Sequence, residues 1–364
     1  MMRSSYKKED VEFLLTDVTK IVKETPLEEK EKLLQLGVCY SEMLPEEYLP
    51  TDEYRNLFEE QLNITAEDIA LYVKILAEKI IKKYQKTQLV LVSLARAGIP
   101  IGILLKHYIE KYYNIKVYHY AISIIRGLGI DENALNYIIA KHNQKEIVFV
   151  DGWTGKGAIQ KELTEACKLY EEKNNIHLDS ELAVLADTGQ CTKLYGTRED
   201  FLIPSACLNS TVSGLVSRTF YRSDIIVDTM FHGAKFYEQF EKFDVSNHFI
   251  EVIEKKYDKV QKIKTDSYKD NIICDFSGWK ETEDIQKAFN IDSINKVKPG
   301  VGETTRVLLR RVPWKILVKD KNDTRIKHII MLAKDRGISV EEYPLKIYNC
   351  VGLIKKVNNY EQGV

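Results

Sequence analysis

A buried strand that ends in an acid and a glycine-rich turn is the segment of this sequence best suited to chemistry. Residues 148–158 read VFVDGWTGKGA, and Asp151 closes the apolar run. The turn that follows consists of Thr154, Gly155, Lys156 and Gly157. Such a turn points main-chain N–H groups inward at a helix N-terminus, which predicts a phosphate-binding loop. A turn that needs glycine for its geometry alone is the competing interpretation.

Two further segments share this character. Residues 93–102, SLARAGIPIG, place Arg96 and the amides of Ala97 and Gly98 between a second apolar run and a helix. Two anion-friendly turns on one sheet predict a ligand that carries phosphate at both ends. Residues 120–131 add Arg126 followed by Gly127 and Gly129, which favours an arm that folds over a bound polyphosphate and excludes water.

In this order the three segments resemble the type I phosphoribosyltransferases, with their pyrophosphate loop, flexible loop and PRPP motif. The resemblance implies that Asp151 contacts ribose hydroxyls, that residues 154–157 hold the 5′-phosphate, and that Asp187 lies near the base or a metal. The second acid of the family motif is Gly152 here, followed by Trp153. PRPP with Mg²⁺, held mostly through the ligand and weakly by Asp187, is the substrate that follows from the resemblance.

Longer segments resemble one bacterial family almost throughout the chain. SYKKEDVEFLL, YSEMLPEEYLP, FVDGWTGKGAI, GTREDFLIPSACLNSTVSGLVSRT and FHGAKFYEQF are similar to the StiP family of tellurite-resistance and stress-response gene clusters. Its members are described as phosphoribosyltransferase-like or as cysteine proteases, usually with a Pelota-like RNA-binding domain at the C-terminus. The resemblance therefore implies two different chemistries.

Phosphoribosyl transfer is the first expectation. Arg96 and Arg126 would stabilise the charge that builds on departing pyrophosphate, while Asp151 holds the ribose. The catalytic set predicted for a transferase is Asp151, Arg96, Arg126 and Asp187.

Thiol proteolysis is the alternative, because Cys207 and His232 are a nucleophile and a base. Asp228 or Asn209 would orient the imidazole. Partners of this kind meet in the fold rather than in the sequence, so spacing leaves the pair open. A third interpretation is a non-catalytic nucleotide sensor that controls RNA binding.

The C-terminal part is basic in a chain whose net charge is −1. Between residues 296 and 319 the sequence contains seven Lys or Arg residues and only one acidic residue, Glu303. KPGVGETTR resembles the loop-and-helix signature of the Pelota and kink-turn-binding group, and we expect Thr304 or Thr305 to cap the helix. The residues predicted to bind RNA are Lys298, Gly300, Gly302, Glu303, Thr304, Arg306 and Arg310.

The elements that position these groups alternate along the chain. Apolar runs at 89–93, 117–123, 146–151 and 181–187, separated by helical patterns, predict a parallel sheet covered on both faces. Helical periodicity at 10–22 and 66–84 predicts a helical N-terminal extension. We expect an extension (1–85), a phosphoribosyltransferase-like α/β domain (86–250), a connecting segment (251–290) and a small α/β Pelota-like domain (291–364).

Composition excludes several classes of protein. Hydrophobic residues make up 44% and charged residues 29% of the chain, as in ordinary globular domains. Six scattered cysteines without CxxC spacing argue against structural zinc. The N-terminal residues lack the apolar core of a signal peptide and no run reaches the ~18 residues of a membrane span, so we expect a cytoplasmic protein with no membrane partner. The sequence leaves a homo-oligomer open.

Overall fold

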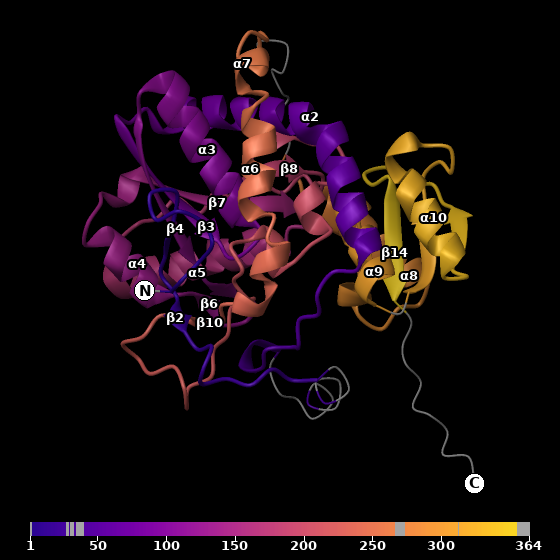
Figure 1. Cartoon of the computed structure of the whole chain (residues 1–364), viewed down its shortest axis with the longest axis horizontal. Coiled ribbons are helices and arrows are strands. Elements are labelled where there is room, and N and C mark those ends of the chain that lie inside the picture. Colours follow the sequence, from indigo (N-terminus) through magenta and orange to yellow (C-terminus); the bar gives the residue numbers. More distant parts are fainter. Residues whose placement is uncertain are drawn as a thin grey trace.

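Figure 1 shows a computed structural model of the chain, which describes residues 2–26, 29, 33, 40–265, 274–311 and 313–354, without the side chains of Tyr40 and Arg310. Its larger unit is a six-stranded sheet in the order β1-β4-β3-β7-β8-β9, and every neighbouring pair is parallel. The strands are β1 (Glu12–Phe13), β4 (Lys116–Ile122), β3 (Gln88–Leu94), β7 (Ile147–Thr154), β8 (Ala183–Asp187) and β9 (Leu194–Thr197). The predicted parallel sheet is confirmed, with β1 and β9 added at its edges.

Helices cover both faces of the sheet because successive strand residues point to opposite sides. Leu89 and Leu91 of β3 pack into one cluster with helices α2, α3 and α6, whereas Val90 and Val92 pack into another with α4 and α5. The covering helices are α2 (Asp52–Tyr84), α3 (Gly98–Tyr113), α4 (Glu132–Ile139), α5 (Ala158–Asn174) and α6 (Ser246–Glu254), followed by α7 (Tyr257–Val260). Apolar runs buried on both faces are what a parallel sheet of this kind requires.

The N-terminal extension differs from its prediction. Residues 10–22 form two short strands and turns rather than a helix, because β1 and β2 (Thr16–Asp17) pair with β4 and β10 (Gly233–Ala234). Long-range strand pairing has overridden the local helical pattern. The helix expected before residue 85 is α2, and it begins at Asp52.

Short elements connect the main ones. They are β5 (Ile124–Ile125), β6 (Gly129–Ile130) and the 3-10 turns η1 (Tyr40–Glu42), η2 (Gln144–Glu146), η3 (Pro204–Ala206), η4 (Ser210–Val212) and η5 (Glu238–Phe243). β5 and β6 form an antiparallel hairpin, with Gly127 and Gly129 at positive φ. The glycine-bearing arm expected around Arg126 is therefore a short hairpin here.

The C-terminal unit has its own sheet in the order β11-β14-β12-β13. Its elements are α8 (Ser277–Ala288), η7 (Ile294–Lys296), β11 (Val297–Pro299), α9 (Val301–Arg310), β12 (Pro313–Val318), η8 (Thr324–Ile326), α10 (Lys327–Asp335), β13 (Ser339–Glu342) and β14 (Cys350–Ile354). Ile285 of α8 is buried with Val297 and Leu353, so α8, which we had placed in a connecting segment, packs with this unit. In Figure 1 the yellow C-terminal unit lies beside the N-terminal end of α2, where the Tyr54 hydroxyl donates to the Leu309 carbonyl at 2.7 Å.

None of the described helices combines the length and the apolar composition that crossing a membrane requires.

Candidate functional site

The turns after β3 and β7 face one hollow at the carboxyl edge of the sheet. Ala97 and residues 154–157 line a cavity of about 220 Å³. A Cβ at Gly98 would collide with the main chain of Val150, so glycine lets the two turns approach each other. The C-terminal unit closes the other side of this hollow through Lys298, Glu303 and Arg306. We call this cavity the junction cleft.

Arg96 does not point into the junction cleft. Its guanidinium donates to Glu47 Oε2 at 2.9 Å and to the Val216 carbonyl at 3.0 Å. The side chain of Arg96 is only 19% exposed and that of Glu47 only 9%, so this ion pair is largely shielded from water. The predicted role of Arg96 as a ligand of pyrophosphate is thus corrected: its charge is used to tie the 209–216 segment to Glu47.

Cationic side chains dominate the junction cleft. Arg126, Lys156, Lys298 and Arg306 line it together with the carboxylic groups of Asp151 and Glu303. Burial, together with the charges of Lys298 and Arg126, lowers the pKa of Lys156 to about 7. Burial likewise lowers the pKa of Lys298, with Arg126 and Arg306 as further causes and Glu303 opposing them. The cleft therefore holds more positive charge than its own acids neutralise.

Asp151 lines the junction cleft. Its Oδ1 accepts the N–H of the next residue, Gly152, at 2.8 Å. Burial raises the pKa of Asp151 to about 7, and the Gly152 hydrogen bond offsets only part of that rise. At neutral pH the carboxyl group is consequently near the midpoint of its titration.

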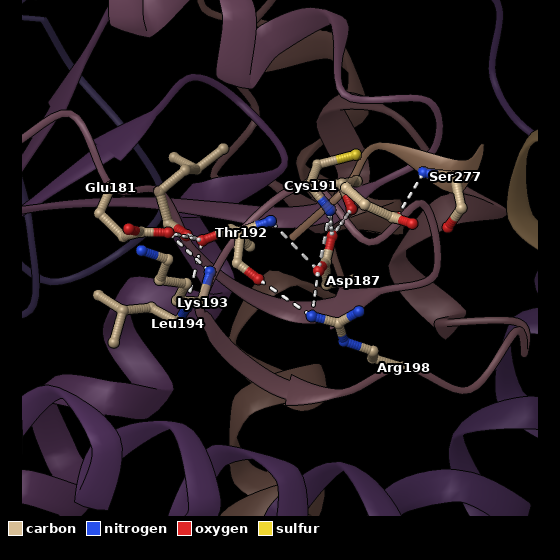
Figure 2. Close-up of polar contacts among 11 residues, drawn as sticks. Glu181, Asp187, Cys191, Thr192, Lys193, Leu194, Arg198 and Ser277 are labelled. Atoms are coloured by element: carbon tan, nitrogen blue, oxygen red, sulfur yellow. Dashed lines mark hydrogen bonds and ion pairs between the residues drawn. The ribbon is translucent and has the colours of Figure 1, made fainter. Parts of the chain in front are cut away.

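Asp187, at the end of β8, acts as a structural acceptor (Figure 2). The side-chain oxygens accept the Cys191 N–H at 2.8 Å, the Thr192 N–H at 3.2 Å and the Thr154 hydroxyl, and Arg198 lies 3.7 Å away. Burial raises the pKa of Asp187 to about 6, against these hydrogen bonds. The carboxylate thus fixes the turn that follows it.

This arrangement does not fit a resident magnesium ion. Mg²⁺ needs several free oxygen ligands in octahedral geometry, and the oxygens of Asp187 are already occupied. Among the described residues, no group of three or more His, Cys, Asp or Glu side chains is placed to hold a metal. The weak metal role predicted for Asp187 is therefore not supported by its contacts.

Cys207 lies between η3 and η4 in a segment that Glu47 positions. Glu47 Oε1 accepts the Ser210 N–H at 2.7 Å while its other oxygen binds Arg96. The Cys207 side chain is fully buried, but its neighbours Ala206 and Leu208 line a second cavity of about 60 Å³. We call this second cavity the thiol-side cavity.

Several residues close to Cys207 in the sequence carry buried hydroxyl groups. Within the described structure, the hydroxyls of Ser205, Ser210 and Thr211 are buried without a hydrogen-bond partner. Unpaired buried polar groups cost free energy, so three of them in one short segment call for an explanation.

His232 lies among different neighbours from Cys207. The imidazole Nδ1 is 2.9 Å from Ser123 Oγ, and the main-chain N–H of His232 donates to Asp131 Oδ2 at 2.6 Å. Burial lowers the pKa of the imidazole, while Asp131 opposes the shift. Asp228, the orienter predicted from the sequence, is exposed, whereas Asp131 accepts the main-chain N–H of His232 and Ser123 lies beside the ring nitrogen. The pairing of Cys207 with His232 stays a prediction.

The helix expected to bind RNA is α9, and its N-terminal N–H of Val301 is already bound by a side chain of the first unit, Asp200. The Asp200 carboxylate accepts the Val301 N–H at 2.7 Å, and burial raises its pKa to about 6. Thr304 and Thr305 lie inside the helix, where Thr305 donates to the Val301 carbonyl at 2.8 Å, so the expected threonine cap is wrong. Thr304 is fully buried.

The remaining residues predicted to bind RNA surround this helix. Gly300 packs against Asp200, Gly302 lies near Ala206, and Lys298, Glu303 and Arg306 line the junction cleft. The side chain of Arg310 lies outside the described residues.

Two residues that hold the candidate site together, Glu47 and Asp200, were missed by the sequence reasoning. Glu47 belongs to an acidic, proline-punctuated segment that we interpreted only as an ordered loop. Asp200 belongs to GTREDF, where a solvated salt-bridged turn was the default interpretation. In both cases the partner lies more than 45 positions away in the chain, so local pattern carries no signal for it.

Comparison with known proteins assigns two regions. Residues 4–254 match the family model of StiP, a tellurite-like stress resistance cysteine protease. Residues 276–356 match the model of the PELOTA RNA binding domain. A cysteine protease StiP of Acinetobacter baylyi is 35% identical, and the match covers 97% of this chain and 94% of the relative.

Solved structures give a much weaker likeness. A hypoxanthine phosphoribosyltransferase of Trypanosoma cruzi is 15% identical, with a TM-score of 0.29 over 38% of this chain and 82% of that one. A structure of the same enzyme in complex with the product IMP is 13% identical, with a TM-score of 0.29 over 50% of this chain and 93% of that one. Similarity at this level carries no argument about activity, and the nearly full-length match to a cysteine protease overturns phosphoribosyl transfer as the principal expectation.

Proposed function

Because this chain belongs to the StiP family of tellurite-like stress resistance cysteine proteases, we propose that it is a cysteine peptidase with an RNA-binding C-terminal region. The observation that carries the peptidase activity is the 35% identity to a cysteine protease across 97% of the chain. The parallel sheet is then a scaffold for a chemistry other than transfer, because one fold can host many activities.

Cys207 is the nucleophile that the geometry supports best. Of the five described cysteines (Cys167, Cys191, Cys207, Cys274 and Cys350), it is the one whose two chain neighbours both line a cavity. Ser205, whose hydroxyl is buried without a partner in the described structure, lines the thiol-side cavity and supplies a polar group there.

The reaction would proceed by acyl transfer to sulfur. The Cys207 sulfur attacks the peptide carbonyl carbon as its proton passes to an imidazole base, and the tetrahedral intermediate expels the amine, which takes that proton. Water then hydrolyses the thioester and regenerates the thiol. The buried sulfur must first become accessible, so substrate entry requires the 204–213 segment to move.

The peptidase proposal is tested with casein and with a peptidyl epoxide that alkylates active thiolates. We expect Cys207→Ser to abolish both cleavage and labelling, whereas Cys167→Ser, in the α5 core, leaves both intact. Unchanged cleavage by Cys207→Ser would place the nucleophile elsewhere. The same assays on His232→Ala decide whether that imidazole is the base.

RNA binding is proposed for residues 276–356 from their match to the PELOTA RNA binding domain. The run of Lys and Arg between residues 296 and 319 supplies the positive charge that phosphate recognition requires. Fluorescence anisotropy with a labelled single-stranded RNA tests this directly. Binding that does not weaken as salt rises would count against a phosphate-based interface.

A further inference from the structure

The N-terminus of α9 cannot receive a phosphate in this arrangement. Asp200 accepts the N–H of Val301, and the Gly300 N–H donates to the Cys350 carbonyl at 2.9 Å. A second anion at this point would meet the Asp200 carboxylate. An RNA strand must therefore contact the C-terminal unit elsewhere.

The cleft-facing side of α9 offers such a surface. Arg306 lies about one helical turn after Glu303, and its guanidinium is 3.0 Å from Glu303 Oε1. Both side chains line the junction cleft. Lys298, just before the helix, lines the same cavity. This side of the C-terminal unit thus presents two cations, only one of which is paired with Glu303.

The first unit presents two more cations to the same space. Lys156 follows β7 and is 8% exposed, and its Nζ donates to the Ile294 carbonyl at 2.5 Å. Arg126, in the β5–β6 hairpin, is exposed and lines the cleft. Positive charge from both units therefore converges on one cavity of about 220 Å³.

Lys156, Lys298 and Arg126 repel one another, and this repulsion favours an anionic ligand in the cleft. The charges of Lys298 and Arg126 add to burial in lowering the pKa of Lys156, and Arg126 acts likewise on Lys298. A phosphate group among them would reverse this repulsion and restore the protonated forms. The cleft is consequently better matched to an anion than to a neutral ligand.

An aromatic ring completes the site. Trp153 is half-buried and lines the junction cleft as well as the thiol-side cavity. Unpaired RNA bases stack on aromatic side chains beside cationic grooves, whereas a simple inorganic anion gains nothing from such a ring.

We propose that single-stranded RNA lies in the junction cleft, with its phosphodiester groups held by Arg126 and Lys156 of the first unit as well as by Lys298 and Arg306 of the C-terminal unit. The proposal rests on the RNA binding proposed above and extends it to residues outside the PELOTA match. Binding would then depend on the docking of the two units.

Arg126→Ala in the full chain is the decisive variant, because Arg126 is exposed and lies outside residues 276–356. With a labelled single-stranded RNA 12-mer of mixed sequence, we expect Kd to rise about tenfold, as loss of one phosphate contact implies. The slope of log K against log salt should fall by about 0.7. Arg126→Lys keeps the charge and should retain most of the affinity.

Lys168→Ala is the matched control. Lys168 is an exposed cation on α5, about 15 Å along that helix from Ala158, so its removal changes net charge without touching the cleft. If Arg126→Ala binds RNA like Lys168→Ala while Arg306→Ala binds weakly, the C-terminal unit acts alone and this inference is overturned, although RNA binding stands. A wild-type chain that binds no 12-mer removes RNA binding itself. Equal affinity for adenosine 5′-monophosphate and the 12-mer would make the cleft a small-molecule site and overturn the inference.

Discussion

The Asp200 carboxylate joins the two units of this chain by accepting the N–H of Val301 at 2.7 Å. Its second oxygen accepts the Asn349 N–H at 2.8 Å, and the Asn349 amide donates back to the Asp200 carbonyl at 2.8 Å. A negative charge at a helix N-terminus is favourable, and here it comes from the other unit. The helix that carries the RNA-binding signature is thereby locked onto the first domain.

Removing this carboxylate should weaken the docking of the two units. Asp200→Ala leaves the N–H groups of Val301 and Asn349 without acceptors, which costs roughly 2–4 kcal/mol in total. We expect a lower melting temperature by differential scanning fluorimetry and faster tryptic cleavage of the native chain. Asp284→Ala, at an exposed position on α8, is the control and should melt like wild type. Identical melting of both variants would contradict the bridging role of Asp200.

Three buried carboxyl groups predict that stability falls as pH rises. The pKa of Asp151 is raised to about 7, and those of Asp187 and Asp200 to about 6. A folded-state pKa above the unfolded value means that the native state binds more protons, so the contribution of these three groups to stability is fully present near pH 4 and is lost as pH rises to about 7.

Asp151→Asn isolates one part of this dependence, because the amide cannot ionise. We expect the variant to gain about 1–2 kcal/mol at pH 7.5 relative to wild type and to show a flatter profile between pH 5 and 7.5. Chemical unfolding across this range measures the effect. A variant with the wild-type slope would show that Asp151 titrates normally.

Much of the sheet was predictable from the sequence, whereas its connections were not. The runs around Leu91, Phe149 and Val184 are apolar on both faces, which only a covered parallel sheet explains. In contrast, residues 10–22 carry a helical pattern but form strand pairs with β4 and β10, which local pattern does not encode.

The candidate site was predictable to the same limited degree. Glycine spacing placed residues 154–157 at the cavity, because backbone geometry is a local property. The partners of Arg96 and α9 were not foreseen, since Glu47 and Asp200 come from distant segments. The nature of the chemistry came from relatedness rather than from spacing.

Gly157 tests how tightly the turn after β7 is packed. It has φ +86°, and a Cβ there would lie 2.6 Å from the Cys191 sulfur and 2.8 Å from the Phe276 ring. We expect Gly157→Ala to destabilise the fold by about 2–3 kcal/mol, from backbone strain and overpacking together. Gly127→Ala is the matched control, because Gly127 has φ +78° with no atom within 4 Å, and it should cost only about 1 kcal/mol. Equal losses in urea unfolding would mean that strain alone matters.

The Glu47–Arg96 pair should govern access to Cys207. Glu47→Ala removes the acceptor of the Ser210 N–H and leaves the Arg96 charge largely buried without its partner, at a cost of about 2 kcal/mol. We expect iodoacetamide to alkylate Cys207 several-fold faster in this variant, because the 204–213 segment is no longer held in place. Glu46→Ala, which alters only an exposed contact with Tyr48, should leave the rate unchanged.

A double-mutant cycle separates this pairing from general loosening of the fold. If Glu47 acts through Arg96, the losses of stability in Glu47→Ala and Arg96→Ala are not additive, and the coupling amounts to about 1–3 kcal/mol. Additive losses would show that the two side chains stabilise the segment independently. An unchanged alkylation rate in Glu47→Ala would show instead that Cys207 is shielded by packing from α2 and α9, because those elements do not depend on the ion pair.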